Sequence, residues 1–162
     1  DLHVEGELSA LNVKPVAPQF EGDAQEDGRV ILRDNFKALF ERHPELLTFG
    51  EDTGRIGGVN QAMEGMQEAF GEHRVFDVGI RECTILGQGI GLAMRGLRYV
   101  AEIQYPDYLY YELQLLRDEL TTVHFRSPRT QRAPPTVRTR GHSLDAVWHD
   151  ASPLGGIILG IR

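Results

Sequence analysis

The residue whose type and position could serve a ligand site is Glu82. It stands between the short apolar segment RVFDV, residues 74–78, and the glycine-spaced segment ECTILGQGIGLAM, which is typical of a buried helix. Open α/β sheets bind ligands outside the carboxyl ends of their parallel strands, so a carboxyl group at this junction could face a ligand. The spacing is equally consistent with an acidic residue that only stabilises the first turn of a helix.

Other polar residues could join Glu82. Glu51 and Asp52 follow an apolar segment and could approach the same cleft, although acidic turn residues are equally expected there. His142 and His149 stand in RTRGH and WHDASP, and by pattern alone such histidines are more often exposed loop residues. Cys83, the only cysteine, is expected to be a small buried residue, and we predict no metal site in this sequence.

The glycines at positions 87, 89 and 91 do not form a phosphate-binding motif. In G-x-G-x-x-G the third glycine would come one residue later, and here the glycines lie about five residues inside the predicted helix. Glycine inside a helix costs about 1 kcal/mol relative to alanine. We therefore interpret Gly87, Gly91 and Ala93 as a smooth helix face that lets another backbone approach closely.

Strands and helices alternate along the chain. Apolar runs predict strands at residues 46–49, 74–78, 98–105 and 135–141, and helical patterns occur at residues 29–43, 60–70, 82–95, 107–125 and 152–162. Such alternation predicts an α/β fold: three layers, with a mainly parallel sheet and helices on both faces, truncated at the C-terminus. Residues 1–28 are interpreted as a linker or extended arm, and residues 29–162 as one incomplete domain.

Composition narrows the classes of function. The 162 residues suffice for one domain, and the 41% hydrophobic and 25% charged content is that of a globular protein. A net charge of −7 argues against nucleic-acid binding, and the arginine-rich stretch at residues 126–140 lacks aromatic residues for base stacking, so it is interpreted as a solvated loop or subunit contact. No apolar run approaches the roughly 18 residues of a membrane span, and a cytoplasmic location is expected. The absent initial methionine indicates a piece of a longer polypeptide.

Several motifs together resemble one family. GED, RVFD followed by IRE, GQGIGLAMRGLRYVAEIQ, DYLYY and WHDASP are similar to the pyrimidine-binding domain of thiamine-diphosphate-dependent 2-oxo acid dehydrogenases, in the beta part of their first component. The similarity runs from about residue 28 to residue 162. The forms IRE, DYLYY and RTRGH are most similar to versions in which alpha and beta parts are fused in one chain.

The resemblance implies roles for individual residues. Glu82 matches the family glutamate that hydrogen-bonds the pyrimidine ring of thiamine diphosphate and drives the tautomerisation that activates the cofactor. Ile80, Gln104 and Tyr108 match positions lining the pyrimidine pocket, with Tyr108 offering a flat face. His149 matches a histidine that assists proton transfer or acyl transfer to a lipoyl arm, and His142 is the alternative. For Tyr110 and Tyr111 we prefer a place in the apolar start of a core helix.

The resemblance also implies partners. The diphosphate and magnesium would be held by the alpha part of the enzyme, so this segment alone is expected to be inactive. A lipoyl-bearing acyltransferase and a dimeric or heterotetramer-like assembly are expected, and pyruvate, branched-chain 2-oxo acids and 2-oxoglutarate all stay open as substrates. The alternatives are a thiamine enzyme of the transketolase or deoxyxylulose phosphate synthase type, and a non-catalytic assembly module of the same fold.

Overall fold

The chain is built around a parallel four-stranded sheet. The computed structural model describes residues 9–20, 22–141 and 154–161. The strands lie in the order β2-β1-β3-β4 and every pair is parallel; they are β1 (Leu46–Gly50), β2 (Val75–Asp77), β3 (Arg98–Glu102) and β4 (Val137–Arg138). The other elements are η2 (Ala10–Asn12), α1 (Gly28–Arg42), α2 (Met66–Phe70), α3 (Glu82–Met94), η3 (Pro106–Glu112), η4 (Leu115–Leu120), α4 (Val123–Arg126) and α5 (Leu154–Gly160).

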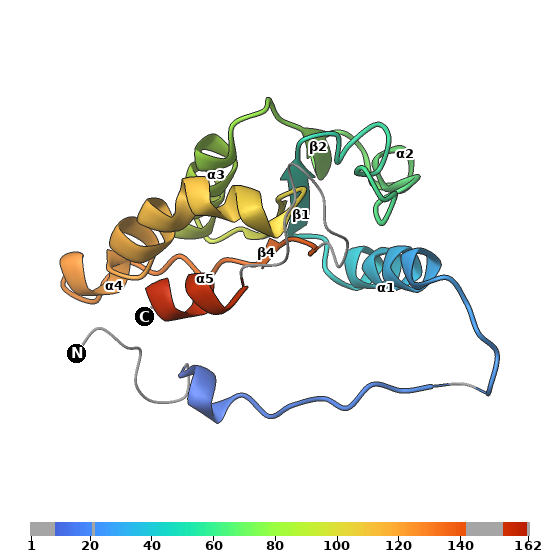
Figure 1. Cartoon of the computed structure of the whole chain (residues 1–162), viewed down its shortest axis with the longest axis horizontal. Coiled ribbons are helices and arrows are strands. Elements are labelled where there is room, and N and C mark those ends of the chain that lie inside the picture. The colour runs from blue at the N-terminus through green and yellow to red at the C-terminus, as the bar shows by residue number, and fades with distance from the viewer. Residues whose placement is uncertain (1–8, 21, 142–153, 162) are drawn as a thin grey trace.

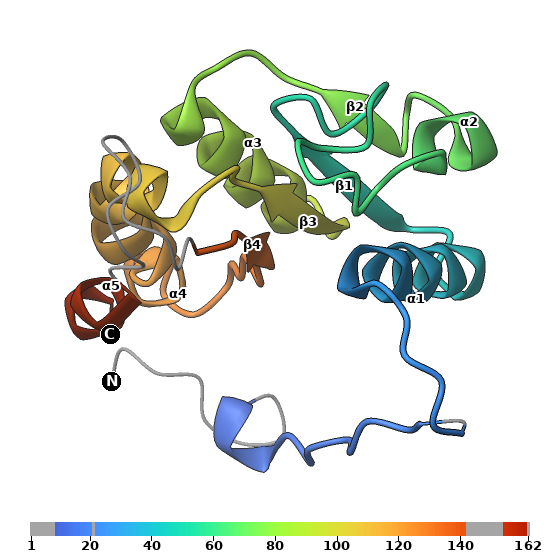
Figure 2. The same ribbon diagram turned by 45° about the vertical axis from the view of Figure 1, so that its right-hand side comes forward.

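Each face of the sheet carries its own hydrophobic core. Side chains alternate between the two faces of a strand, and β1 accordingly sends Phe49 into one core and Leu46 into the other. The larger core joins β1 and β3 to α3, η3, η4 and α5, and the smaller joins α1, α2 and the start of β2. Figures 1 and 2 show α1 and α3 on opposite sides of the sheet. The predicted three-layer α/β fold with a parallel sheet is therefore confirmed.

The prediction of a helix at residues 60–70 is wrong for the first half of that segment. The segment before α2 is a series of turns, because Gln61 has φ of 56° and Gly65 has φ of 73°. These left-handed conformations interrupt a right-handed helix. Only residues 66–70 are helical, and Met66 points into the smaller core.

The single long helix predicted at residues 107–125 is also wrong. The segment consists of the 3-10 helix η3, the π-helical η4 and the short helix α4. Near the end of η4 the hydroxyls of Thr121 and Thr122 donate to the carbonyls of Arg117 and Asp118, four residues earlier. Such bonds from side chain to backbone bend or loosen helices. The change of winding matters for the site, because it decides which side chains of η3 point inward.

The glycines of α3 do not all serve the same purpose. A Cβ added at Gly87 or Gly91 would meet nothing within 4 Å among the described residues, whereas one added at Gly89 would meet the ring of Tyr99. The smooth face at Gly87 and Gly91 is therefore not used within the described part of this chain, and its contact with another backbone stays a prediction. Gly89 is the glycine that lets α3 approach β3.

The residues before α1 follow an extended path. After η2, residues 13–20 and 24–27 have no regular secondary structure, and Leu11, Val16 and Phe20 are almost fully exposed. Figure 1 shows this stretch running apart from the sheet. Its interpretation as a linker or arm stays a prediction. Among the described residues, none of the helices combines the length and apolar character needed to cross a bilayer.

Arg74 connects α1, α2 and β1 through one side chain. Its guanidinium donates to the carbonyl oxygens of Leu46 (3.1 Å), Phe40 (3.0 Å) and His43 (2.7 Å). The same group lies 4.7 Å from the ring centre of Phe40 and 5.1 Å from that of Phe70. Only the planar fork of arginine combines three such bonds with stacking.

We expect Arg74→Lys to lower the free energy of unfolding by about 1 to 2 kcal/mol, because at least one buried carbonyl loses its donor. Urea unfolding followed by circular dichroism measures the loss. Arg98→Lys, at an exposed position at the start of β3, is the matched control and should change stability by less than about 0.5 kcal/mol. Equal effects of the two substitutions would contradict this role of Arg74.

Candidate active-site cleft

An open cleft lies at the carboxyl edge of the sheet, beside β1 and β3. The chain leaves β1 toward β2 on one side and leaves β3 toward β4 on the other, and such a switch point is where open α/β sheets bind ligands. The cleft has a volume of about 550 Å³. Its walls come from the end of β1, the start of α3 and the segment after β3, with the residues Glu51, Ile80, Arg81, Glu82, Cys83, Gln104, Tyr108 and Tyr111.

Glu82 is the first residue of α3 and lines this cleft. The residue before it, Arg81, is extended and makes no side-chain cap for the helix, so Glu82 is the acidic group of the first turn. Glu82 is half-buried, and its neighbour Ile80 is 65% exposed. The cleft therefore has an apolar rim, but this chain alone does not exclude water from it.

Cys83 is exposed, so the prediction of a buried cysteine is wrong. Its Sγ lies 2.9 Å from the carbonyl oxygen of Tyr111 and donates to it. This bond joins the first turn of α3 to η3. The thiol thus helps to fix Glu82 relative to the aromatic residues of η3.

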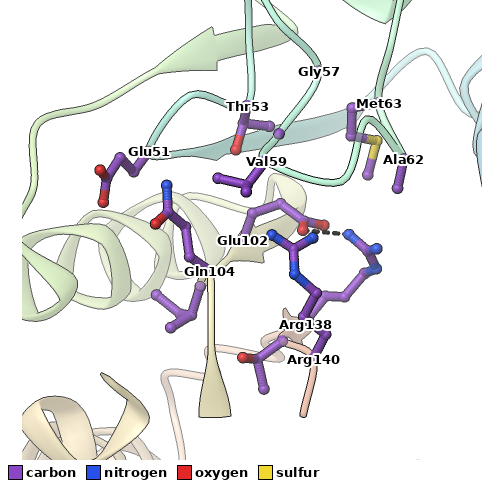
Figure 3. Close-up of a pocket in the computed structure, with 13 residues that line it drawn as sticks. Glu51, Thr53, Gly57, Val59, Ala62, Met63, Glu102, Gln104, Arg138 and Arg140 are labelled. Carbon is purple, nitrogen blue, oxygen red and sulfur yellow. Dashed lines mark hydrogen bonds and ion pairs between the residues drawn. The ribbon is translucent and has the colours of Figure 1, made fainter. Parts of the chain in front are cut away.

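Glu51 and Gln104 meet at the ends of the two central strands. Burial raises the pKa of Glu51, the charges of Asp52 and Glu82 raise it further, and a hydrogen bond with the Gln104 side chain lowers it. Figure 3 shows the two side chains near each other, Glu51 directly after β1 and Gln104 in the segment after β3. The pair offers a carboxylate and an amide to the same ligand.

The loop after β1 is held in place by the end of β2. Asp77 accepts hydrogen bonds from the backbone N–H groups of Gly54 (2.6 Å) and Arg55 (3.2 Å). A carboxylate that accepts two backbone donors restrains a loop effectively, because bonds to a charged acceptor are stronger than neutral ones. Glu51 therefore reaches the cleft from a restrained turn.

The aromatic residues that line the cleft, Tyr108 and Tyr111, come from η3. Tyr105 and Tyr108 pack edge to face, with ring centres 5.7 Å apart and planes at 82°, and the Arg140 guanidinium lies 5.2 Å from the Tyr105 ring centre. Burial raises the pKa of Tyr108, and the nearby charges of Asp107, Glu51 and Glu82 add to the effect. Tyr108 thus presents its ring beside both acidic groups of the cleft.

The preferred interpretation of Tyr110 and Tyr111 as core residues is wrong. They are 47% and 69% exposed, and Tyr111 belongs to the rim of the cleft. In η3, which has a period of three, the inward positions are those of Pro106, Leu109 and Glu112. The sequence pattern offered no sign of this winding.

A partly buried ion pair lies next to the cleft. The Arg138 guanidinium donates to the Glu102 carboxylate, as Figure 3 shows. Burial raises the pKa of Glu102 to about 7, and Arg138 opposes this rise through its charge and its hydrogen bond. Arg138 and Arg140 are only partly exposed, so the first interpretation of the arginine-rich stretch, a solvated loop, does not fit these two residues, and the second, a subunit contact, stays a prediction. They contact the carboxyl edge of the sheet.

The structure brings together five of the residues singled out in the sequence: Glu51, Ile80, Glu82, Gln104 and Tyr108. His142 and His149 lie outside the described residues. Arg81 and Tyr111 also line the cleft and were not predicted to do so; adjacency to Ile80 and Glu82 was the only signal for Arg81. Cys83, which suits an apolar cleft as a neighbour of Glu82, lines it as well. Within the described residues, no cluster of histidine, cysteine, aspartate and glutamate could hold a metal ion.

The arrangement suits a flat nitrogen heterocycle. A carboxyl group at one wall can exchange a proton with a ring nitrogen, Glu51 and Gln104 can hydrogen-bond an exocyclic amino group, and Tyr108 offers an aromatic face. The residues that line the cleft fit such a ring.

Residues 25–152 match the family described as transketolase, pyrimidine binding domain. The chain belongs to this family. The match covers most of the chain, and it includes the whole described sheet and every residue lining the cleft.

Individual relatives agree with this assignment. The pyrimidine-binding domain is 41% identical over 108 residues to a protein of Staphylococcus epidermidis named pyruvate dehydrogenase E1 component subunit beta, covering 67% of this chain and 33% of the relative. It is 39% identical over 107 residues to 2-oxoisovalerate dehydrogenase subunit beta of Pseudomonas aeruginosa, covering 66% and 31%. The chain therefore spans about one third of the length of the curated relatives it matches.

Proposed function

We propose that this domain is the pyrimidine-binding part of a thiamine-diphosphate-dependent 2-oxo acid dehydrogenase. The observation that carries the proposal is the placement of Glu82, Gln104 and Tyr108 around one cleft at the carboxyl edge of the sheet. Two relatives are named as subunits of pyruvate dehydrogenase and of 2-oxoisovalerate dehydrogenase, and both names support a 2-oxo acid dehydrogenase reaction. The whole enzyme would decarboxylate a 2-oxo acid oxidatively and transfer the acyl group to a lipoyl group.

In this proposal the chain's residues bind and protonate one ring of the cofactor. Thiamine diphosphate, when bound, supplies the carbanion that attacks the 2-oxo acid. Glu82 exchanges a proton with a pyrimidine nitrogen, Glu51 and Gln104 orient the amino group, and Tyr108 and Ile80 cover the ring. The half-buried state of Glu82 and the exposed rim at Ile80 and Tyr111 leave room for a second surface that completes the site.

We assign that second surface to the diphosphate-binding alpha part, which would also hold magnesium. A lipoyl-bearing acyltransferase is the expected acyl acceptor, within a dimeric or heterotetramer-like assembly. His149, or in its place His142, stays our candidate for proton or acyl transfer. The cytoplasmic location also stays a prediction.

The test is cofactor-dependent decarboxylation by the enzyme assembled with its diphosphate-binding part. We expect reduction of an artificial electron acceptor to require thiamine diphosphate, magnesium and one of three substrates: pyruvate, a branched-chain 2-oxo acid or 2-oxoglutarate. A transketolase-type enzyme would instead transfer two-carbon units between sugar phosphates. An assembly module would bind its partners and turn over none of these substrates, and either result would refute the proposal.

A further inference from the structure

A buried carboxyl group lies behind the cleft and belongs to neither of its walls. Glu112, the last residue of η3, has 0% of its surface exposed. The three-residue period of η3 turns it inward together with Pro106 and Leu109. Neither of its carboxyl oxygens has a hydrogen-bond partner among the described residues. An unpaired buried carboxyl group is unusual in a native fold and calls for an explanation.

The groups that face Glu112 lead toward the cleft. On the α3 side the neighbouring charge is Glu82, and on the β3 side the neighbouring titratable group is Tyr99. The hydroxyl of Tyr99 is also buried and unpartnered among the described residues. The bond from the Cys83 thiol to the carbonyl of Tyr111 fixes the residue before Glu112 against the first turn of α3. Tyr99, Glu112 and Glu82 therefore lie in sequence from the protein interior to the cleft.

The environment decides the charge of Glu112. A buried carboxylate without a cation or donors is strongly disfavoured, so the neutral acid is the stable form. Burial raises the pKa of Glu112 to about 8, with a further contribution from the charge of Glu82. At pH 7 the side chain accordingly holds a proton and places no negative charge beside Glu82.

We propose that Glu112 is a positioning residue that keeps a proton behind Glu82 and thereby sets how readily Glu82 gives up its own. The proposal rests on the proposed function and adds a residue that does not touch the cofactor. While Glu112 is neutral, Glu82 can release its proton to the ring nitrogen. When Glu112 ionises, a like charge in a dry environment favours the protonated form of Glu82 and opposes this transfer.

The first test needs no catalytic activity. In the assembled enzyme, infrared difference spectra should show a protonated-carboxyl band at pH 7 that disappears with a midpoint near the pKa of about 8. Glu112→Gln, a neutral replacement of similar shape, should remove this band. Glu102→Gln identifies the contribution of the other buried carboxyl group, whose pKa is about 7. Glu82→Gln should move the Glu112 midpoint downward, since it removes the like charge.

The second test is the pH profile of kcat/KM. The normal enzyme should lose activity above about pH 8, roughly tenfold per pH unit once the proton is lost. Glu112→Gln should keep the pH 7 activity within about threefold and show no such fall up to about pH 9. Glu112→Asp, which restores an ionisable group, should restore an alkaline fall, whereas a purely structural role would leave the profile unchanged in every variant.

The outcomes separate this inference from the proposed function. A Glu112 band that is absent, or a midpoint that does not move in Glu82→Gln, overturns the inference whatever the enzyme catalyses. If the Glu112 midpoint does move in Glu82→Gln but the enzyme has no thiamine-dependent activity, the interaction between the two carboxyl groups is supported and the proposed function is refuted. A Glu112→Gln profile identical to that of the normal enzyme shows that the pair has no part in turnover and also overturns the inference.

Discussion

Glu82→Gln reduces kcat/KM for 2-oxo acid decarboxylation at least about 100-fold in the assembled enzyme, the loss expected when a group that transfers protons is removed. Glutamine fills the same space and can still hydrogen-bond the pyrimidine ring, but it cannot release a proton to the ring nitrogen. Because Glu82 begins α3 at the wall of the cleft, the substitution leaves the packed face of the helix untouched. Steady-state rates at saturating thiamine diphosphate measure the effect, and fluorescence titration shows that the cofactor still binds.

A second acidic residue in a first helical turn provides the control. Glu68 occupies that position in α2 and is exposed, so Glu68→Gln removes the same charge from a comparable helix end away from the cleft. If Glu82 only stabilised its helix, both substitutions would cost no more than about 1 kcal/mol in the free energy of unfolding and neither would slow turnover. Unchanged kcat/KM in Glu82→Gln would therefore remove the main support for the proposed function.

The elements that could be predicted are those that follow from local, periodic patterns in the sequence. The apolar runs of β1, β2 and β3 and the glycine-spaced α3 lie where their patterns place them, because strand and helix periods depend on neighbouring residues. The rule that parallel strands end at one edge then brings Glu51, Glu82 and Gln104 into one cleft. The first step uses only neighbouring residues, and the second adds the general rule for the edges of parallel sheets.

The unpredicted part depends on contacts between distant segments. Nothing near Glu112 in the sequence indicates that η3 winds with a period of three, so its buried carboxyl group and the exposed Tyr111 were both missed. Likewise, Arg138 pairs with Glu102, which is 36 residues away in the sequence. Periodicity does not encode such pairings, since they form only after β3 and β4 lie side by side.

The position of α3 depends on one close approach, and we expect Gly89→Ala to disturb it. An added Cβ would lie 2.5 Å from a ring carbon of Tyr99 and 2.8 Å from its hydroxyl oxygen. The ring of Tyr99 has little room to move, because it is 2% exposed and packs on Phe49 with ring centres 5.7 Å apart. Overpacking of this kind costs about 1 to 3 kcal/mol. Urea unfolding measures the loss.

Gly87→Ala and Gly91→Ala are matched controls on the same helix. Neither added Cβ would meet an atom within 4 Å among the described residues, so in the unassembled chain each should gain up to about 1 kcal/mol from helix propensity. A double variant that also carries Tyr99→Leu should recover part of the Gly89→Ala loss, since the two residues are in contact and their effects are not additive. Because α3 begins with Glu82, tilting it away from β3 would also displace that carboxyl group from Gln104. Gly89→Ala should therefore lower cofactor affinity in the assembled enzyme, and equal stability of all three alanine variants in the unassembled chain would show that α3 is not positioned by this contact.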